Sequence, residues 1–205
     1  HPLANVEDVK ELERYPWPET DAGYRYEALR AETQKLHERG YSAAGLIPLH
    51  GGTIFETAWG LRGLENLLAD FLVNKEYAPA RLDKVTDLNC KATEKLVEAG
   101  VDVVRMGDDV GTQKAMMMAP ETWREMLKPR LAKVIQAAKS VNPDVFIFYH
   151  SDGNVEAIIP ELIDIGVEIL NPVQPECMDP AKIKKLYGDR LSFWGTIGTQ
   201  TTMPF

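Results

Sequence analysis

Apolar residues along this chain follow two alternating patterns, helical spacing and short continuous runs. In the helical pattern, apolar side chains recur every three or four positions, as in a helix with one buried face. The continuous runs are short and several are rich in valine and isoleucine, which is typical of buried strands. Helices are predicted at 21–40, 61–72, 82–97, 123–138, 158–163 and 180–187, and strands at 43–49, 101–106, 145–148, 167–170 and 191–194.

Strands that alternate with helices predict a parallel sheet with helical crossovers. Two helices are expected between the first and second strands, and one long helix with a kink at Pro129 between the second and third. The tripeptide Gly-Thr-Gln recurs just after a strand at 111–113 and 198–200, which indicates a repeated strand–helix unit. A (β/α)8 barrel typically needs about 250 residues. We therefore expect an incomplete (β/α)8 barrel of the α/β class over 43–205, lacking units at each end, and a helical connecting segment over 1–42, all in one domain.

The net charge and the number of cysteines limit the kinds of molecule that are expected to bind this protein. The formal net charge is −8, and no Lys/Arg cluster marks a face for nucleic acid or an anionic membrane. No apolar run approaches the roughly 20 residues of a membrane span. Two cysteines are too few for a disulfide framework and fit a reducing cytoplasm. A small-molecule substrate or another protein is the expected partner, and a homo-oligomer is compatible with the sequence.

Polar side chains gather where the predicted strands end. His150 and Asp152 follow the third strand, and Asp108 and Asp109 follow the second. Because the carboxyl ends of parallel strands meet at one edge, these groups are candidates for catalysis. Simpler interpretations remain open: His150 and Asp152 would also serve as caps of the next helix. Successive side chains of a strand point to opposite faces, so one of Asp108 and Asp109 at most is expected in the pocket.

Further strand ends carry candidate substrate-binding groups. His50 precedes a glycine pair that would let a ligand approach the backbone, although a simple turn explains the same residues. Amide side chains at later strand ends suit substrate recognition. The candidates for substrate binding are His50, Gln113, Asn171, Gln174 and Gln200. Trp123 and Trp194 are interpreted as core residues.

Two stretches of the sequence resemble the uroporphyrinogen decarboxylase superfamily. They are residues 107–130, which begin GDDVGTQ, and residues 148–204, which begin FYHSDGN and include the segment NPVQPE. The superfamily contains the decarboxylase of haem biosynthesis and cobalamin-dependent methyltransferases. The resemblance covers roughly residues 43–205 and implies a (β/α)8 barrel, in agreement with the pattern of strands and helices.

The two branches of the superfamily imply different sites. The decarboxylase branch would show a Phe-Asp-Ser-Trp-like segment where this chain has GDDVG at 107–111, and it needs no metal. The methyltransferase branch holds zinc through a His-x-Cys pair. His150 matches its first position and Asp152 replaces the cysteine, so a metal site would use His150 and Asp152, with Cys177 as a further candidate ligand. Zinc accepts carboxylate oxygen as well as thiolate, although Asp makes the site harder.

Three functions follow from this resemblance. The first, which we favour, is a methyltransferase that moves a methyl group between a small substrate and a corrinoid or thiol. The corrinoid would be free or carried by a partner protein. The second is a metal-free decarboxylase of a tetrapyrrole, with Asp108 or Asp109 stabilising the protonated intermediate. The third is a non-catalytic barrel that binds a tetrapyrrole or a protein partner.

Overall fold

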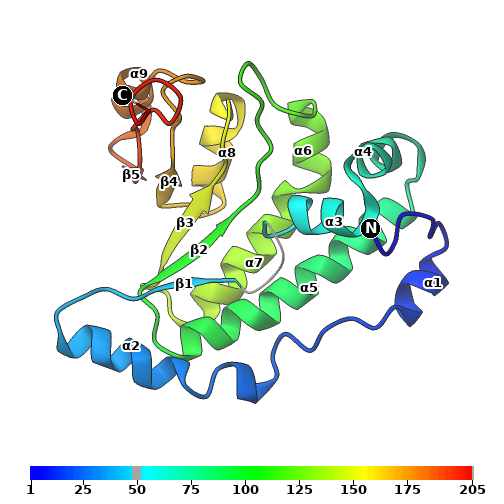
Figure 1. The fold of residues 1–205 in the computed structure, drawn as a ribbon, viewed down its shortest axis with the longest axis horizontal. Coiled ribbons are helices and arrows are strands. Elements are labelled where there is room, and N and C mark those ends of the chain that lie inside the picture. Colours follow the sequence, from blue (N-terminus) through cyan, green and yellow to red (C-terminus); the bar gives the residue numbers. More distant parts are fainter. Residues whose placement is uncertain (48–51, 205) are drawn as a thin grey trace.

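The computed structural model describes residues 1–47 and 52–204. Strands and helices alternate along most of this length (Figure 1). The strands are β1 (Ala44–Leu46), β2 (Val103–Gly107), β3 (Phe146–His150), β4 (Ile169–Asn171) and β5 (Ser192–Phe193). The helices are α1 (Val9–Arg14), η1 (Gly23–Arg25), α2 (Leu29–Glu38), α3 (Phe55–Arg62), α4 (Leu64–Val73), α5 (Tyr77–Glu98), α6 (Pro120–Met126), α7 (Lys128–Val141), η2 (Glu156–Ile158), α8 (Ile159–Asp164) and α9 (Pro180–Tyr187).

The five strands of the described residues form one parallel sheet in the order β1-β2-β3-β4-β5. Neighbours in sequence are neighbours in the sheet, as in a (β/α)8 barrel, and the sheet does not close. The register aligns one residue from each strand across the sheet, and this row contains Leu46, Arg105, Phe148, Ile169 and Ser192. The prediction of a partial barrel with about five parallel strands is confirmed.

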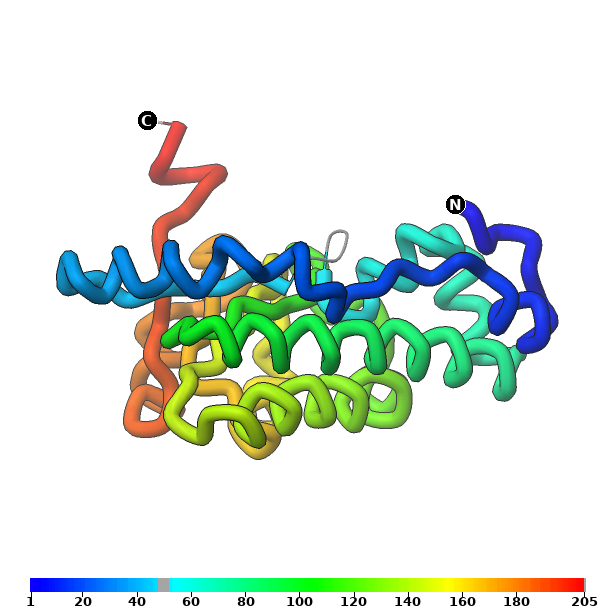
Figure 2. Tube along the Cα trace, turned by 90° about the horizontal axis from the view of Figure 1, so that it is seen from below, coloured from blue at the N-terminus to red at the C-terminus, as the bar shows by residue number. Residues whose placement is uncertain are grey.

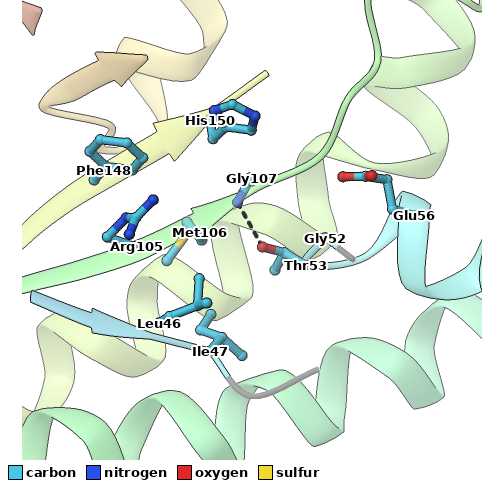
Figure 3. A pocket seen from close by; sticks show the side chains of 10 residues that line it. All are labelled: Leu46, Ile47, Gly52, Thr53, Glu56, Arg105, Met106, Gly107, Phe148 and His150. Atoms are coloured by element: carbon cyan, nitrogen blue, oxygen red, sulfur yellow. Dashed lines mark hydrogen bonds between the residues drawn. The ribbon is translucent and has the colours of Figure 1, made fainter. Parts of the chain in front are cut away.

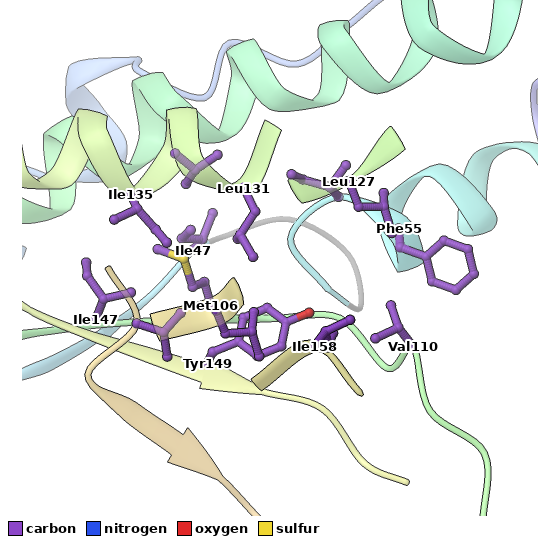
Figure 4. Packing of buried hydrophobic residues seen from close by; sticks show 14 of the residues in the cluster. Ile47, Phe55, Met106, Val110, Leu127, Leu131, Ile135, Ile147, Tyr149 and Ile158 are labelled. Carbon is purple, nitrogen blue, oxygen red and sulfur yellow. The ribbon is translucent and has the colours of Figure 1, made fainter. Parts of the chain in front are cut away.

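One face of the sheet packs against helices. Met106, Ile147 and Tyr149 alternate with inward-facing neighbours along β2 and β3 and point toward α7 (Figure 4). Burial of these side chains against Leu131 and Ile135 of α7 makes the main apolar core. Figure 2 shows α5 and α7 side by side beneath the strands. Trp123 is buried in this core, as predicted.

The opposite face of the sheet, the inner face of the incomplete barrel, is open. Leu46 and Phe146 are 63% and 51% exposed there, although both belong to strands. Trp194, which the sequence placed in the core, is 54% exposed, so that prediction is wrong. Its ring meets Phe148 edge to face at 5.3 Å between centroids, because it follows β5 on the inner side. The alternation along each strand therefore separates a helix-covered face from a face that lines the barrel interior.

Two helix predictions need correction. Among the described residues, three helices rather than two lie between β1 and β2. The additional helix is α3, and the expected helix around 61–72 starts only after Gly63, whose φ of 89° no helix accommodates. The predicted kink at Pro129 is a complete break between α6 and α7. Proline lacks an amide hydrogen and its ring clashes with the carbonyl four residues earlier, so the second helix starts afresh with Pro129 in its first turn.

The N-terminal segment lies along the outside of the helical layer, close to α5 (Figures 1 and 2). Leu3, Leu12 and Tyr77 form a small apolar cluster separate from the main core. Farther along, His37 of α2 contacts Asp102 at 2.8 Å. The division of the chain at residue 42 stays a prediction. Within the described residues, no helix combines the length and apolar character needed to cross a membrane.

Candidate functional site

His150 ends β3 on the inner face, in a row formed with Gly107 of β2 and Asn171 of β4. Its Nδ1 lies 2.5 Å from Asn171 Oδ1, and the Asn171 amide nitrogen donates to the carbonyl oxygen of Trp194. Because that amide group is oriented by a carbonyl, its oxygen accepts and His150 Nδ1 donates. In the neutral form of the ring this tautomer leaves Nε2 unprotonated and facing the barrel interior, the form in which histidine binds metals or accepts protons.

Two carboxylates face this nitrogen. His150 Nε2 lies 3.5 Å from Asp109 Oδ1 and 3.9 Å from Asp152 Oδ1. The Asp152 backbone N–H donates to Asp109 Oδ1 at 2.8 Å, which joins the loops after β2 and β3. One candidate ligand atom from each of the three residues lies within 4.8 Å of the others. We call Asp109, His150 and Asp152 the acid–histidine cluster.

Asp108 points the other way, into the start of α3. Its Oδ1 accepts the backbone N–H groups of Ile54 and Glu56 at 3.0 Å each, although the two residues lie on a different strand–helix unit. Burial raises the pKa of the Asp108 carboxyl to about 7, against the lowering effect of these N–H groups. A Cβ on Gly52 would lie 2.5 Å from Asp108 Oδ1, so only glycine fits beside this carboxylate. Asp108 is placed to hold α3 against β2.

Replacing Asp108 with alanine is expected to lower the free energy of unfolding by roughly 1–3 kcal/mol, because buried N–H groups at the start of α3 lose their acceptor. Asp108→Asn keeps an acceptor oxygen and should lose less. Urea denaturation of both variants measures the difference. Equal losses in the two variants would show that the helix start does not depend on this contact.

Glu56 belongs to the same site and was not among the residues predicted from the sequence. Its Oε2 accepts the Asp109 backbone N–H at 3.0 Å from the first turn of α3. Burial raises the pKa of the Glu56 carboxyl, and the Asp109 N–H lowers it. No motif marks Glu56, since it reaches the site only because α3 starts beside the end of β2. The N–H contact fixes the backbone that carries Asp109.

The other predicted residues have different surroundings. Gln174 is buried and its Oε1 accepts the Gly153 N–H at 3.1 Å, which supports the loop after β3. Cys177 Sγ lies 3.2 Å from Gln113 Oε1, and burial raises the pKa of its thiol. Cys177 is not a member of the acid–histidine cluster, whose third candidate ligand is Asp109. Gln200 is exposed, and its backbone N–H donates to Glu176. His50 lies outside the described residues.

Asp152 does not cap the following helix, which settles one alternative left open by the sequence. The side chain that accepts a backbone N–H at this turn is Asn154, whose Oδ1 receives the N–H of Glu156 at 3.1 Å. Asp152 is exposed and directed to His150 instead. Its carboxylate is thus available to a ligand.

A cavity of about 240 Å³ opens below this cluster on the inner face of the sheet. His150 and Glu56 lie at one end of it, and Arg105 and Phe148 lie deeper (Figure 3). The exposed side chain of Leu46 forms a further part of the lining, and Ile47 and Met106, whose side chains lie in the core, border the cavity as well. A mostly apolar wall with a few convergent polar groups is typical of a small-molecule site.

The fold and this strand-end site define a barrel of the uroporphyrinogen decarboxylase type, and comparison with known proteins agrees. Residues 1–203 match the family described as "Uroporphyrinogen decarboxylase (URO-D)". The chain belongs to this family, which confirms the resemblance seen in the sequence.

Individual relatives are methyltransferases by name. A methylcobamide:CoM methyltransferase MtaA of Methanosarcina barkeri is 34% identical over 122 residues, covering 60% of this chain and 34% of the relative. Another MtaA, from M. barkeri strain Fusaro (DSM 804), is 29% identical over 154 residues, covering 70% and 43%. A solved methyltransferase from Methanosarcina mazei superposes with a TM-score of 0.68 at 23% identity, covering 87% of this chain and 50% of that one, and shares its fold. The chain thus spans half or less of each relative.

Proposed function

We propose that this chain forms the substrate-binding part of a methyltransferase that moves a methyl group between a small substrate and a corrinoid or thiol. The observation that carries the proposal is the acid–histidine cluster, which directs His150 Nε2 and two carboxylates to one point at the end of a small cavity. The names of the MtaA relatives support the same reaction class. The corrinoid would reach the site as a free molecule or on a partner protein.

The donor set of the cluster fits a metal ion. An imidazole nitrogen and two carboxylate oxygens are ligands that zinc accepts, and they suit harder ions such as Mn²⁺ better than a thiolate pair would. Asp109, His150 and Asp152 would hold the ion. A bound divalent cation supplies Lewis acidity, which favours the deprotonated form of a thiol.

The residues around the cluster have separate roles in this proposal. Asn171 holds His150 in the tautomer whose Nε2 is free. Glu56 fixes the backbone of Asp109 from α3, and Gln174 fixes that of Gly153. Because these supports come from several strand–helix units, the ligand directions are set by the barrel rather than by one loop. The size of the cavity, about 240 Å³, suits a small substrate.

The test is methyl transfer by the full-length protein. Demethylation of methylcobalamin with coenzyme M or 2-mercaptoethanol as acceptor, followed by absorbance, should proceed with the unaltered protein. His150→Ala should lower the rate at least 100-fold, because it removes the central donor of the cluster. His37→Ala, an exposed histidine remote from the cavity, is the matched control and should leave the rate unchanged. Loss of a carboxyl group from a porphyrinogen with no methyl transfer would instead assign the chain to the decarboxylases.

A further inference from the structure

We propose that a small monovalent anion, such as chloride, binds in the interior between α3, α4 and α5, beside Arg81. This place is remote from the acid–histidine cluster along α3, because Glu56 lies in the first turn of that helix and Arg62 is its last residue. Arg62, Asp70 and Arg81 come one from each of the three helices and are 4%, 5% and 0% exposed. We call Arg62, Asp70, Tyr77 and Arg81 the buried arginine cluster.

Arg81 has hydrogen-bond donors without acceptors. Its Nη1 donates to Asp70 Oδ2 at 3.0 Å, but its Nε and Nη2 have no hydrogen-bond partner among the described residues. The hydroxyl of Tyr77, a residue that is 1% exposed, has no partner there either. The Tyr77 ring faces Arg81, with 4.8 Å between Cζ and the ring centroid, so these groups share one region of the interior. Because a guanidinium donates and never accepts, the ligand that fits here is an acceptor.

The charges of the cluster favour an anion over a water molecule. Two guanidinium groups share one carboxylate, since Arg62 donates to both oxygens of Asp70 and Arg81 donates to one of them. Within the described part of the chain, neither arginine has another carboxylate at ion-pair distance. One positive charge in excess is therefore buried, which is costly without a counter-ion. Water would accept the N–H groups but leave that charge uncompensated.

Burial limits the size and the charge of the ion. The N-terminal segment covers the cluster, since Arg62 Nη1 donates to the carbonyl oxygens of Leu3, Ala4 and Val6 (Figure 1). A polyatomic anion such as phosphate or sulfate needs more room, and with two negative charges it would exceed the single positive charge. A halide carries one charge, is only moderately larger than water and accepts hydrogen bonds from any direction. Chloride and bromide are therefore the anions that fit.

The test compares the stability of the full-length protein in two salts. It needs no methyl transfer, so it is independent of the proposed function. Urea denaturation is measured in sodium chloride and in sodium gluconate at equal ionic strength, because gluconate is too large for the interior. Chloride should raise the urea midpoint in a saturable way, since it binds the folded state only. At ten times its dissociation constant it should lower the unfolding equilibrium constant about tenfold.

Arg81→Met removes the excess charge together with the unpaired donors, so the midpoint of this variant should be the same in both salts. The comparison is made within the variant and does not depend on its own stability. Arg39→Gln is the matched control, since Arg39 also stacks on a tyrosine ring, that of Tyr41, but is exposed at the end of α2. It should keep the full difference between chloride and gluconate.

Bromide gives a second measurement, which needs no variant. Anomalous diffraction from crystals of the unaltered protein in sodium bromide should place one ion in contact with Arg81 Nε or Nη2. Equal midpoints in the two salts for the unaltered protein, or crystals without bromide at Arg81, would overturn the inference. A chloride effect that persists in Arg81→Met would overturn it as well, because the ion would then bind elsewhere.

Discussion

Replacing Asp70 with alanine should lower the free energy of unfolding by about 3–5 kcal/mol, the largest effect on stability expected in this chain. Asp70 is 5% exposed and lies between Arg62 and Arg81, which are 4% and 0% exposed. Arg62 donates to both Asp70 oxygens, at 2.9 and 3.1 Å, and Arg81 donates to one at 3.0 Å. The variant would leave two buried cations without their carboxylate.

The cost is high because neither arginine has another carboxylate among the described residues. Both guanidinium groups face the ring of Tyr77, which offers cation–π contact but carries no negative charge. Arg62 also donates to the carbonyl oxygens of Leu3, Ala4 and Val6, so the N-terminal segment depends on the same group. Loss of Asp70 is therefore expected to loosen residues 1–6 as well as the contact between α3 and α5.

Urea denaturation followed by circular dichroism measures this change. Glu32→Ala is the control, because Glu32 pairs with Lys35 at the surface and its loss should change the free energy by less than about 0.5 kcal/mol. A similarly small effect of Asp70→Ala would show that water reaches the two arginines and replaces the carboxylate.

The second large effect concerns the ligand set of the proposed metal site. Asp109→Asn should weaken binding of Zn²⁺ or Mn²⁺ by more than the roughly 10- to 100-fold that follows loss of an outer-shell partner. The reason is geometric, since Asp109 Oδ1 lies 3.5 Å from His150 Nε2 within the three-residue cluster. Cys177→Ser should leave affinity unchanged, because its thiol contacts Gln113 instead.

Competition with a fluorescent chelator on the metal-free full-length protein gives these affinities. Asp144→Asn, an exposed aspartate before β3, controls for the loss of one negative charge. A different result would be weaker metal binding in Cys177→Ser and unchanged binding in Asp109→Asn. The metal would then be held by the ligands that the sequence resemblance suggests and not by those that the geometry suggests.

The sheet was predictable because its strands are short apolar runs between helices, and the order of strands follows from that alternation. The points at which the helices are interrupted were less predictable from the sequence. Gly63 breaks one helix through its backbone conformation, and Pro129 separates two helices rather than bending one. Trp194 was assigned to the core because large aromatic residues are usually buried, but a strand of a barrel has two apolar faces and only one is covered by helices here.

The site was predictable to the extent that it lies at strand ends. Asp108 and Asp109 were expected to diverge, and they do so: one accepts N–H groups of α3 and the other faces His150. The sequence could not say which was which, because the direction depends on where the strand stops. Glu56 was missed for a related reason, since its position depends on the packing of α3. The roles of these residues in catalysis stay predictions.

The hydrogen bonds that run from Trp194 through Asn171 to His150 determine which side chain can change in evolution without disturbing the imidazole. The first member is a main-chain carbonyl, which has neither rotamers nor tautomers. The direction of both hydrogen bonds is thus set by the backbone beside β5. A change of the side chain at position 194 leaves both bonds intact. Substitution of Trp194 is therefore compatible with an unaltered position of the proton on His150.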